Sequence, residues 1–352
     1  MDNIARRASP RKGRKNATSH IKKRVTSYDV AAAAEVSQST VSRAFAGGAK
    51  VAPHVLKRIQ DVAERLGYRP NELARTLISR RSNMVGLVMG ETQNPFYPAV
   101  MSGFTRELQK IGRRVLLFSV PPGHDVDAVL PQVLQYHVSG VIVASASISS
   151  KMARSLKAEG TPAVVFSRAI YDGEISAVCC ANAAAARLVA QRLLDAGYRR
   201  FGLIGGQANT STHIERRRAF AERLRRNGID SFEEEPGLNT YEGGYAAALK
   251  ILKKKPRPEA LFCISDIAAL GALEAARHEL RLRVPEDLAV VGFDDIPAAS
   301  WPSYSLTTVR QPVEEMIAKS IELLLEQIDG KRVTPTTVRI PAELIVRRSA
   351  VL

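Results

Sequence analysis

The sequence predicts a small all-α domain, a helix-turn-helix unit, followed by an α/β sensor made of two doubly wound lobes of parallel sheet. Short helical patterns fill residues 25–68, and from Met84 onward short apolar runs alternate with amphipathic helices. Excess positive charge is concentrated in the N-terminal quarter, because residues 1–84 contain 18 of the 51 Lys and Arg residues but only 6 of the 35 acidic residues. A basic first quarter favours a polyanionic partner for that part of the chain.

The first 24 residues are rich in Arg, Lys, Ser and Asn and have almost no large apolar side chains. We expect residues 1–24 to be a disordered basic tail, which either solubilises the chain or adds nonspecific attraction to DNA. No apolar run is long enough to span a bilayer, and the basic N-terminus lacks the apolar stretch of a signal peptide. The expected location is therefore cytoplasmic, in association with the nucleoid.

Residues 25–69 are expected to form the helical domain. A first helix over Tyr28–Ala34 leads through a tight turn to a second helix that starts at Ser37, a good N-cap residue. A third helix over Pro53–Leu66 ends at the C′ glycine Gly67. Four apolar side chains can meet in a miniature core: Val30, Ala33, Val41 and Phe45. The outer face of the second helix then carries Gln38, Ser39 and Arg43, and such side chains at an exposed helix start suit reading of the DNA major groove.

Residues 70–83 are expected to form a linker with a short helical pattern over 71–81. This pattern has no large apolar face of its own. An isolated helix of two or three turns is marginal in water, so we expect it to fray unless something packs on it.

From residue 84 to 352, continuous apolar runs alternate with amphipathic helices, which is typical of parallel strands covered on both faces. The runs are MVGLVMG, VLLFSV, VSGVIVAS, TPAVVFS, FGLIGG, ALFCIS and LAVVGFD. Two lobes fit their number, the first over about 84–180 with 312–338 and the second over 181–311 with 339–352. Ligands bind such folds beyond the carboxyl ends of the strands, so the cleft between the lobes is the expected ligand site.

Four motifs follow one another in the order and at the spacing of a known protein family: DVA…VSQSTVSRA at Asp29–Ala44, LGYRPNELARTL at Leu66–Leu77, NPFY at Asn94–Tyr97 and VVGFDD…LTTVRQP at Val290–Pro312. From Val25 to its end the chain resembles the lac-repressor (LacI/GalR) family of bacterial transcription regulators. The resemblance implies a homodimer on a double-stranded DNA operator, most often acting as a repressor. It also implies a sensor like periplasmic sugar-binding proteins, controlled by a small-molecule effector. Because no leucine heptad follows the last strand, we expect no tetramer.

Carried over by position, the resemblance makes Gln38, Ser39 and Arg43 the base-reading residues. Glutamine suits adenine and arginine suits guanine, although Arg43 could instead contact phosphate only. Three further side chains are expected to contact the DNA backbone or to pack: Tyr28, Thr40 and Ser42.

The linker resembles the family's hinge helix, which pairs with its copy in the DNA minor groove. The hinge residues implied by position are Asn71, Ala74, Arg75 and Leu77. Leu77 would wedge between the central base pairs, where unstacking a base step bends the DNA and gains contact surface. The alternative is that Leu77 packs on the sensor.

The effector-binding residues implied by position surround the expected cleft: Asn94, Phe96, Tyr97, Ser167, Arg168, Arg216, Ser265, Asp294 and Gln311. Arg216 can donate two hydrogen bonds to hydroxyls or a carboxylate, and Asp294 can accept from hydroxyl or amine groups. The neighbouring Arg217 and Arg218 are expected on a solvated helix face.

The chain departs from the family pattern at three positions. Glu35 stands where the turn usually has glycine, and a left-handed backbone there costs about 1–2 kcal/mol. Ser167 stands where Asp or Asn is frequent, and Ser265 where Asn is usual. Both serines have shorter polar side chains than Asp or Asn, while Arg168 and Arg216 are kept. We therefore hypothesise an acidic or sparsely hydroxylated effector such as a sugar acid or an organic acid.

Three other function classes agree less well with these features. A transport-type solute-binding protein would need only the lobes, but the basic first quarter argues against it. An enzyme would need a phosphate loop, a metal cluster or a nucleophile arrangement, and the sequence has none, so no catalytic residue, metal or cofactor is expected. A nucleoid-type DNA packer would need no cleft. The scattered histidines, His213 among them, are expected on the surface, and the three cysteines are expected to be reduced and partly buried.

Overall fold

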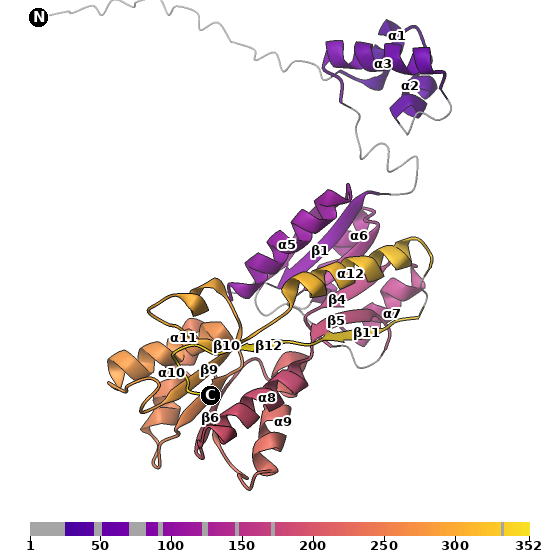
Figure 1. The fold of residues 1–352 in the computed structure, drawn as a ribbon. Helices are drawn as coiled ribbons and strands as arrows, with labels where there is room; N and C mark the ends of the chain where they lie inside the picture. The colour runs from indigo at the N-terminus through magenta and orange to yellow at the C-terminus, as the bar shows by residue number, and fades with distance from the viewer. Residues whose placement is uncertain are drawn as a thin grey trace, which may run out of the picture. The chain divides into compact units, whose positions relative to one another are not determined.

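A computed structural model describes residues 25–45, 51–69, 82–90, 94–121, 126–144, 148–169, 173–331 and 334–352. The chain divides into two compact units, Met1–Arg80 and Arg81–Leu352, each with its own set of elements (Figure 1). None of the helices in the described ranges is long and apolar enough to cross a membrane.

The described residues of the first unit form the helices α1 (Ser27–Ala33), α2 (Gln38–Phe45) and α3 (Pro53–Leu66). Helix α1 begins one residue earlier than the sequence pattern suggested because Thr26 and Asp29 form a capping box at its start. The Ser37 hydroxyl accepts a hydrogen bond from the backbone N–H of Thr40 at 3.2 Å, which caps α2. The predicted bounds of α3 are confirmed, and Gly67 follows it with a φ of 67°.

The core of this unit differs from the expected one at a single position. Val30, Val41 and Ile59 are fully buried. Ala33 is exposed, so its prediction as a core residue was wrong, and Ala31 and Ala34 are buried instead. The reason is helical phase: at 100° per residue Val30, Ala34 and Ala31 share one face, and Ala33 lies beyond its edge.

The first lobe of the second unit is a six-stranded sheet in the order β11-β5-β4-β3-β1-β2, with every pairing parallel. Its strands are β1 (Met84–Gly90), β2 (Arg114–Val120), β3 (Gly140–Ala144), β4 (Ala163–Phe166), β5 (Ser176–Cys180) and β11 (Thr337–Ile340). Alternate residues of each strand face opposite layers, so Leu87 packs with Phe104 while Val88 packs with Leu130. The helices are α5 (Phe96–Lys110), α6 (Leu130–Gln135), α7 (Ser150–Ala158) and α12 (Val313–Ile328), with a short 3-10 turn at Val126–Ala128.

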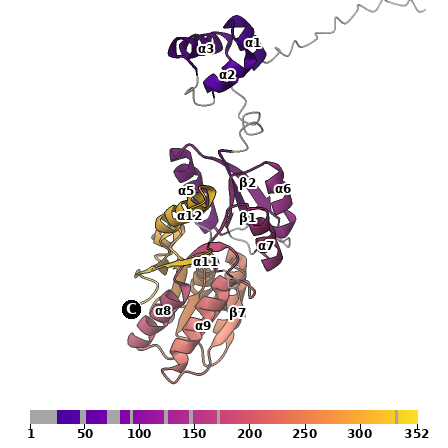
Figure 2. The same ribbon diagram turned by 90° about the vertical axis from the view of Figure 1, so that its right-hand side faces the viewer.

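The second lobe has the order β12-β10-β9-β8-β6-β7, parallel except for the β10/β12 pair. Its strands are β6 (Phe201–Gly205), β7 (Glu233–Pro236), β8 (Ala260–Cys263), β9 (Ala289–Asp294), β10 (Thr307–Arg310) and β12 (Glu343–Ile345). Its helices are α8 (Asn182–Asp195), α9 (Ser211–Arg225), α10 (Tyr241–Lys253) and α11 (Asp266–Glu274), with a π turn at Ala275–Glu279 and a 3-10 turn at Pro297–Ser300. Helices α8 and α9 lie side by side on one side of the lobe (Figure 2).

Glycines allow α10 and α11 to approach closely on the other side of this lobe. A Cβ on Gly244 would lie 2.1 Å from the carbonyl oxygen of Ala268, and a Cβ on Gly271 would lie 2.0 Å from that of Tyr241. Both contacts are with backbone, which cannot move aside as a flexible side chain can. The two helices therefore need glycine at these positions to pack at this distance.

The chain passes between the lobes three times, from β5 to α8, from β10 to α12 and from β11 to β12. The sequence placed the last passage between residues 338 and 339, but β11 continues to Ile340 and pairs there with Cys180 of the first-lobe sheet. Each lobe therefore combines two separate stretches of the chain. The carboxyl ends of the central strands of both sheets point into the region between the lobes, where a ligand site is expected in such folds.

Candidate functional site

Asp294 ends strand β9 and its carboxylate joins the two lobes. Oδ2 accepts a hydrogen bond at 3.1 Å from the amide of Asn94, which belongs to the first lobe, and Oδ1 accepts one at 2.7 Å from Gln311 in the second passage between the lobes. Asp294 is 6% exposed and has a φ of 133°, and Ser167 at the end of β4 has a φ of 69°. Strained non-glycine backbone of this kind costs about 1–3 kcal/mol and concentrates at functional sites.

Arg216 of helix α9 is fixed from three sides. Its Nε donates to Oδ1 of Asn182 at 2.8 Å, and one terminal nitrogen donates to the carbonyl oxygen of Ile264 at 2.6 Å. The guanidinium also lies 3.4 Å from the centre of the Phe293 ring, a cation–π contact, and 3.7 Å from the Asp294 carboxylate. A buried arginine held in this way is preorganised to present its planar donors to a ligand.

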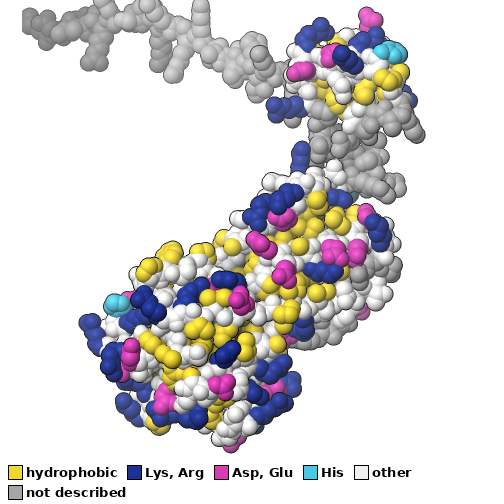
Figure 3. All heavy atoms as spheres, in the orientation of Figure 1, with side chains coloured by type: hydrophobic (Ala, Val, Ile, Leu, Met, Phe, Trp, Pro, Cys, Tyr) yellow, Lys and Arg dark blue, Asp and Glu magenta, His cyan; other side chains and the backbone are white. Residues whose placement is uncertain are grey.

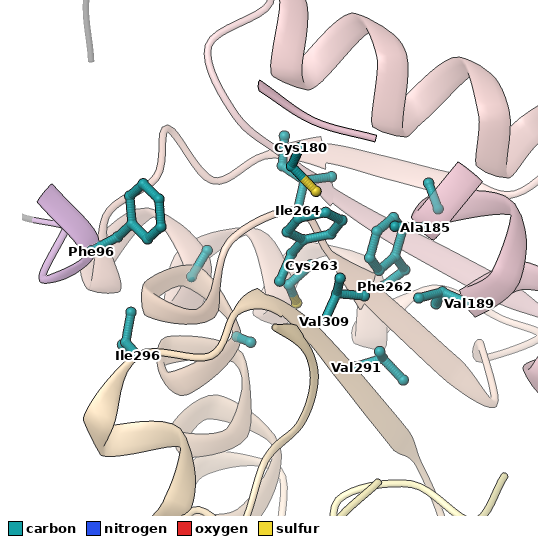
Figure 4. Packing of buried hydrophobic residues seen from close by; sticks show 14 of the residues in the cluster. Phe96, Cys180, Ala185, Val189, Phe262, Cys263, Ile264, Val291, Ile296 and Val309 are labelled. Atoms are coloured by element: carbon teal, nitrogen blue, oxygen red, sulfur yellow. The ribbon is translucent and has the colours of Figure 1, made fainter. Parts of the chain in front are cut away.

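The first lobe contributes Tyr97 and Arg168. Their side chains are hydrogen-bonded, and burial nevertheless raises the pKa of the Tyr97 hydroxyl, so the phenol stays neutral. Phe96 is 5% exposed and belongs to the core, where its ring meets that of Tyr97 edge-on at 5.1 Å. Figure 4 shows Phe96 at the border of the buried cluster that contains Ile264 and Cys180.

Asp266 begins helix α11 and is fully buried. Its carboxyl group accepts a hydrogen bond from the backbone N–H of Ile296 at 2.9 Å and is bonded to the Thr308 hydroxyl. Burial, and then the nearby charge of Asp294, raise the pKa of Asp266 to about 8, so this group is protonated at neutral pH. Burial also raises the pKa of Asp294, while the guanidinium of Arg216 opposes the shift. With Asp266 neutral, the charged groups here are the Asp294 carboxylate and the guanidinium of Arg216, with Arg168 beside Tyr97. The next carboxylate, Asp295, is paired with Arg310 and Arg347.

Within the described parts of the chain, Oγ of Ser265 and Oε1 of Gln311 are buried and have no hydrogen-bond partner. Ser265 precedes helix α11, and Gln311 holds Asp294 through its other amide atom. An unsatisfied buried polar atom costs about 1–3 kcal/mol. A bound ligand that donates to Gln311 and bonds to Ser265 would remove that cost.

The structure therefore brings together six of the residues that the family resemblance implied: Asn94, Tyr97, Arg168, Arg216, Asp294 and Gln311. Sequence reasoning missed Asn182 and Asp266. Asn182 opens helix α8 directly after strand β5, but the short run SAVCC is not among the apolar runs that predict strands. Asp266 follows a buried strand just as its neighbour Ser265 does, yet the family pattern indicates only Ser265 as a site residue.

The surface predictions for the Arg217–Arg218 pair and for His213 have opposite outcomes. Arg217 and Arg218 are confirmed on a solvated face, where they pair with Glu234 and Glu222 at 2.7 Å. The surface prediction for His213 was wrong: the side chain is 9% exposed, and its Nδ1 accepts a hydrogen bond from the Gly206 N–H at 3.2 Å. Burial lowers the pKa of His213, which keeps the ring neutral as an acceptor.

The exposed face of α2 forms the second candidate site. Arg43 lies along the helix, with Nε donating to the carbonyl of Ser39 at 3.2 Å and a terminal nitrogen donating to Thr40 Oγ1 at 3.2 Å. Gln38 donates to the Ser27 hydroxyl at 3.3 Å, a long bond that DNA could replace. Ser42 is partly buried, whereas Tyr28 is 71% exposed on α1.

The turn before α2 has the strained backbone expected from its sequence, with a φ of 54° at Glu35. The hinge residues Asn71, Ala74, Arg75 and Leu77 lie outside the described residues.

On the face of the sensor that the space-filling view shows, basic and acidic side chains are mixed (Figure 3).

Comparisons with known proteins cover both units. Residues 26–71 match the family model for bacterial regulatory proteins of the lacI family, and residues 190–350 match a periplasmic binding protein-like domain. The chain is 32% identical over 337 residues to the HTH-type transcriptional regulator CelR of Thermobifida fusca, with 93% of this chain and 99% of CelR covered. It is 30% identical to catabolite control protein A of Priestia megaterium, with 92% and 99% covered.

Solved structures give the same picture. The lac repressor dimer bound to operator and the anti-inducer ONPF superimposes with a TM-score of 0.84 at 25% identity, covering 93% of this chain and 99% of that one. A complex of the regulator CelR with cellobiose superimposes with a TM-score of 0.69 at 30% identity, covering 93% and 100%.

Proposed function

Because the chain belongs to the lacI family of bacterial regulatory proteins, we propose that it represses transcription by binding a DNA operator with an affinity set by a small molecule. Members of this family are transcription regulators rather than enzymes. The observation that carries the effector half of the proposal is the Asn94–Asp294–Gln311 contact, since a ligand there meets both lobes and one passage between them. A ligand that favours one arrangement of the lobes shifts the population toward it.

For the operator we propose that Gln38, Ser39 and Arg43 read base edges, with Tyr28, Thr40 and Ser42 on the backbone or in packing contacts. The exposure of Ser39 and Arg43 and the exposed start of α2 support this assignment. Losing a bidentate arginine–guanine contact costs about 1–3 kcal/mol at that base alone, whereas losing a phosphate contact weakens all sequences alike.

We propose that the linker acts as a hinge helix, with Asn71, Ala74, Arg75 and Leu77 in the minor groove. Leu77→Ala should weaken operator binding strongly and leave effector affinity unchanged, because only the wedge between base pairs is lost. Operator affinity equal to that of the wild type would refute the hinge role.

The effector we propose is a small carboxylic acid, either a sugar acid or an organic acid. Two arginines support an anion, since Arg216 beside Asp294 and Arg168 beside Tyr97 can donate to its carboxylate, while the buried Asp266 is neutral. Ser167 and Ser265 offer fewer and shorter acceptors than Asp or Asn would, which disfavours a ligand covered in hydroxyls.

The proposal is tested by operator selection from genomic fragments with the purified protein, followed by affinity measurements on the best site over a range of salt concentrations. A short palindrome bound far more tightly than random DNA supports a dimeric regulator working at the nucleoid. Saturable ligand binding separates it from a DNA packer, which needs no cleft. Binding without sequence preference, with and without ligand, would contradict the proposal.

The effector class is tested by calorimetric titration of the operator-free protein with citrate, malate, D-gluconate and D-glucuronate, against glucose and cellobiose. The acids should bind and compete with one another, and Arg168→Gln should weaken them. A neutral sugar that binds at micromolar affinity with no acid competing would overturn the acid assignment and leave the regulator assignment standing.

A further inference from the structure

Two of the three passages between the lobes lie next to each other. Strand β11 pairs in parallel with β5, with Arg339 opposite Cys179, and both strands then continue into the second lobe. From β11, the guanidinium of Arg339 reaches Glu215 on helix α9 of the second lobe, with nitrogen–oxygen distances of 2.8 and 3.0 Å. A two-pronged ion pair therefore joins the lobes beside the hinge.

This ion pair is partly withdrawn from water. The Glu215 side chain is 11% exposed and that of Arg339 is 40% exposed. Bidentate arginine–carboxylate pairs fix geometry as well as charge, and partial burial reduces their screening by salt. A pair of this kind on one rigid body would only add local stability. Across a hinge, it holds the two bodies in one relative orientation.

The Glu215 carboxylate also controls Asn182, which opens helix α8 and is 1% exposed. Asn182 Nδ2 donates to Glu215 Oε2 at 3.3 Å, and Asn182 Oδ1 accepts from Nε of Arg216 at 2.8 Å. A carboxylate can only accept, so it selects the amide orientation in which the nitrogen faces Glu215 and the oxygen faces Arg216. One carboxylate thus governs the hinge contact and the orientation of the buried guanidinium.

We propose that Glu215 is a positioning residue that clamps the two lobes at the hinge and, through Asn182, orients Arg216 in the cleft. The role of Arg216 toward an effector rests on the proposed function, whereas the clamp does not. When the clamp opens, the lobes gain freedom and the amide of Asn182 is released to rotate. Any ligand that needs the clamped arrangement then loses apparent affinity by the factor by which that arrangement is depopulated.

The substitution that tests the clamp is Glu215→Gln, which keeps shape but removes the charge and allows the new amide to donate to Asn182. Spin labels are attached at Lys151→Cys on α7 and Lys253→Cys on α10, both exposed and one on each lobe. The three native cysteines are fully buried and do not compete for the label. Labelled protein is mixed with excess unlabelled protein, so that electron–electron distance measurements report pairs within one chain.

We expect one narrow distance distribution in the otherwise wild-type protein and a broadened or shifted one in Glu215→Gln and Arg339→Gln. The double variant should change no further, because each single change already removes the same contact. The matched control is Glu222→Gln on the same helix, whose partner Arg218 belongs to the same lobe, and it should leave the distribution unchanged. Circular dichroism at the measurement temperature confirms that all variants are folded.

The second readout is the Nε proton of Arg216, identified by NMR from its absence in Arg216→Lys. Bonded to Asn182, it should exchange slowly with water in the wild type and in Glu222→Gln, and at least several-fold faster in Glu215→Gln. Unchanged distance distributions, or an unchanged exchange rate, would overturn the corresponding half of the proposal. Because neither readout uses operator or effector, such a failure is separate from a failure of the proposed function.

Discussion

Replacing Asp266 by asparagine should change how the stability of the sensor depends on pH. The carboxyl group is fully buried, accepts from Ile296 N–H and is bonded to the Thr308 hydroxyl. Burial raises its pKa from the ordinary 3.8 to about 8, and the charges of Asp294 and Asp295 act in the same direction. Between these two pH values the folded protein holds a proton that the unfolded chain has lost.

The sign of the effect follows from proton linkage. The folded state binds more protons in this window, so the free energy of unfolding falls as the pH rises from about 4 to about 8 and levels off above it. One full proton corresponds to about 1.4 kcal/mol per pH unit, which gives a loss of about 2–3 kcal/mol between pH 5 and pH 7. Asparagine keeps an acceptor for Ile296 and gains a donor for Thr308, yet it does not titrate.

The assay is urea unfolding of the full chain at pH 5, 6, 7 and 8, followed by the circular dichroism of the sensor. Asp266→Asn should match the wild type at pH 5 and exceed it at pH 8. The control is Asp287→Asn, because Arg283 lowers the pKa of Asp287 to about 2 and its charge is constant over this range. Parallel stability curves for wild type and Asp266→Asn would refute the assignment of the buried proton.

Three further changes have expected outcomes. Glu35→Gly should stabilise the helical unit by about 0.5–1 kcal/mol, since relief of the left-handed strain exceeds the entropy that glycine costs, and amide hydrogen exchange of α1 and α2 would slow accordingly. Gly244→Ala should destabilise the sensor by about 1–3 kcal/mol through its clash with Ala268, visible as a lower melting temperature, whereas an unchanged one would mean that α10 and α11 can move apart. Arg43→Ala should relax base preference at one operator position, and a uniform loss over all sequences would reassign it to phosphate.

Much of the fold follows from sequence patterns because hydrophobic periodicity and caps are local. The bounds of α3 and the C′ glycine Gly67 can be read from neighbouring residues, whereas the left-handed turn at Glu35 was indicated only by the glycine that the family pattern has there. Strand β7 has the sequence EEEP and could not be predicted from it. The strand lies at an edge of the sheet, where its glutamates pair with Arg217, Lys250 and Lys254.

The site was predictable only where the family pattern names its residues. Asp294 lies in a recognisable motif and Arg216 is assigned by position, but the state of both depends on groups distant in sequence. The contact of Asn94 with Asp294 spans 200 positions, and the proton on Asp266 depends on burial that no local pattern encodes. His213 shows the same limit, since its burial arises from packing against Gly205 at a strand end.

The three passages of the chain between the lobes also bear on how the protein is made. The first lobe takes α12 and β11 from beyond residue 312, and the second takes β12 from residues 343–345. During synthesis from the N-terminus, α1 to α3 leave the ribosome and can fold while both sensor sheets still lack a strand. A nascent chain thus presents its DNA-binding helices before the part that regulates them exists. Residues 337–345 then supply the missing strand of both sheets, so a chain that stops before residue 337 should have two damaged lobes rather than one.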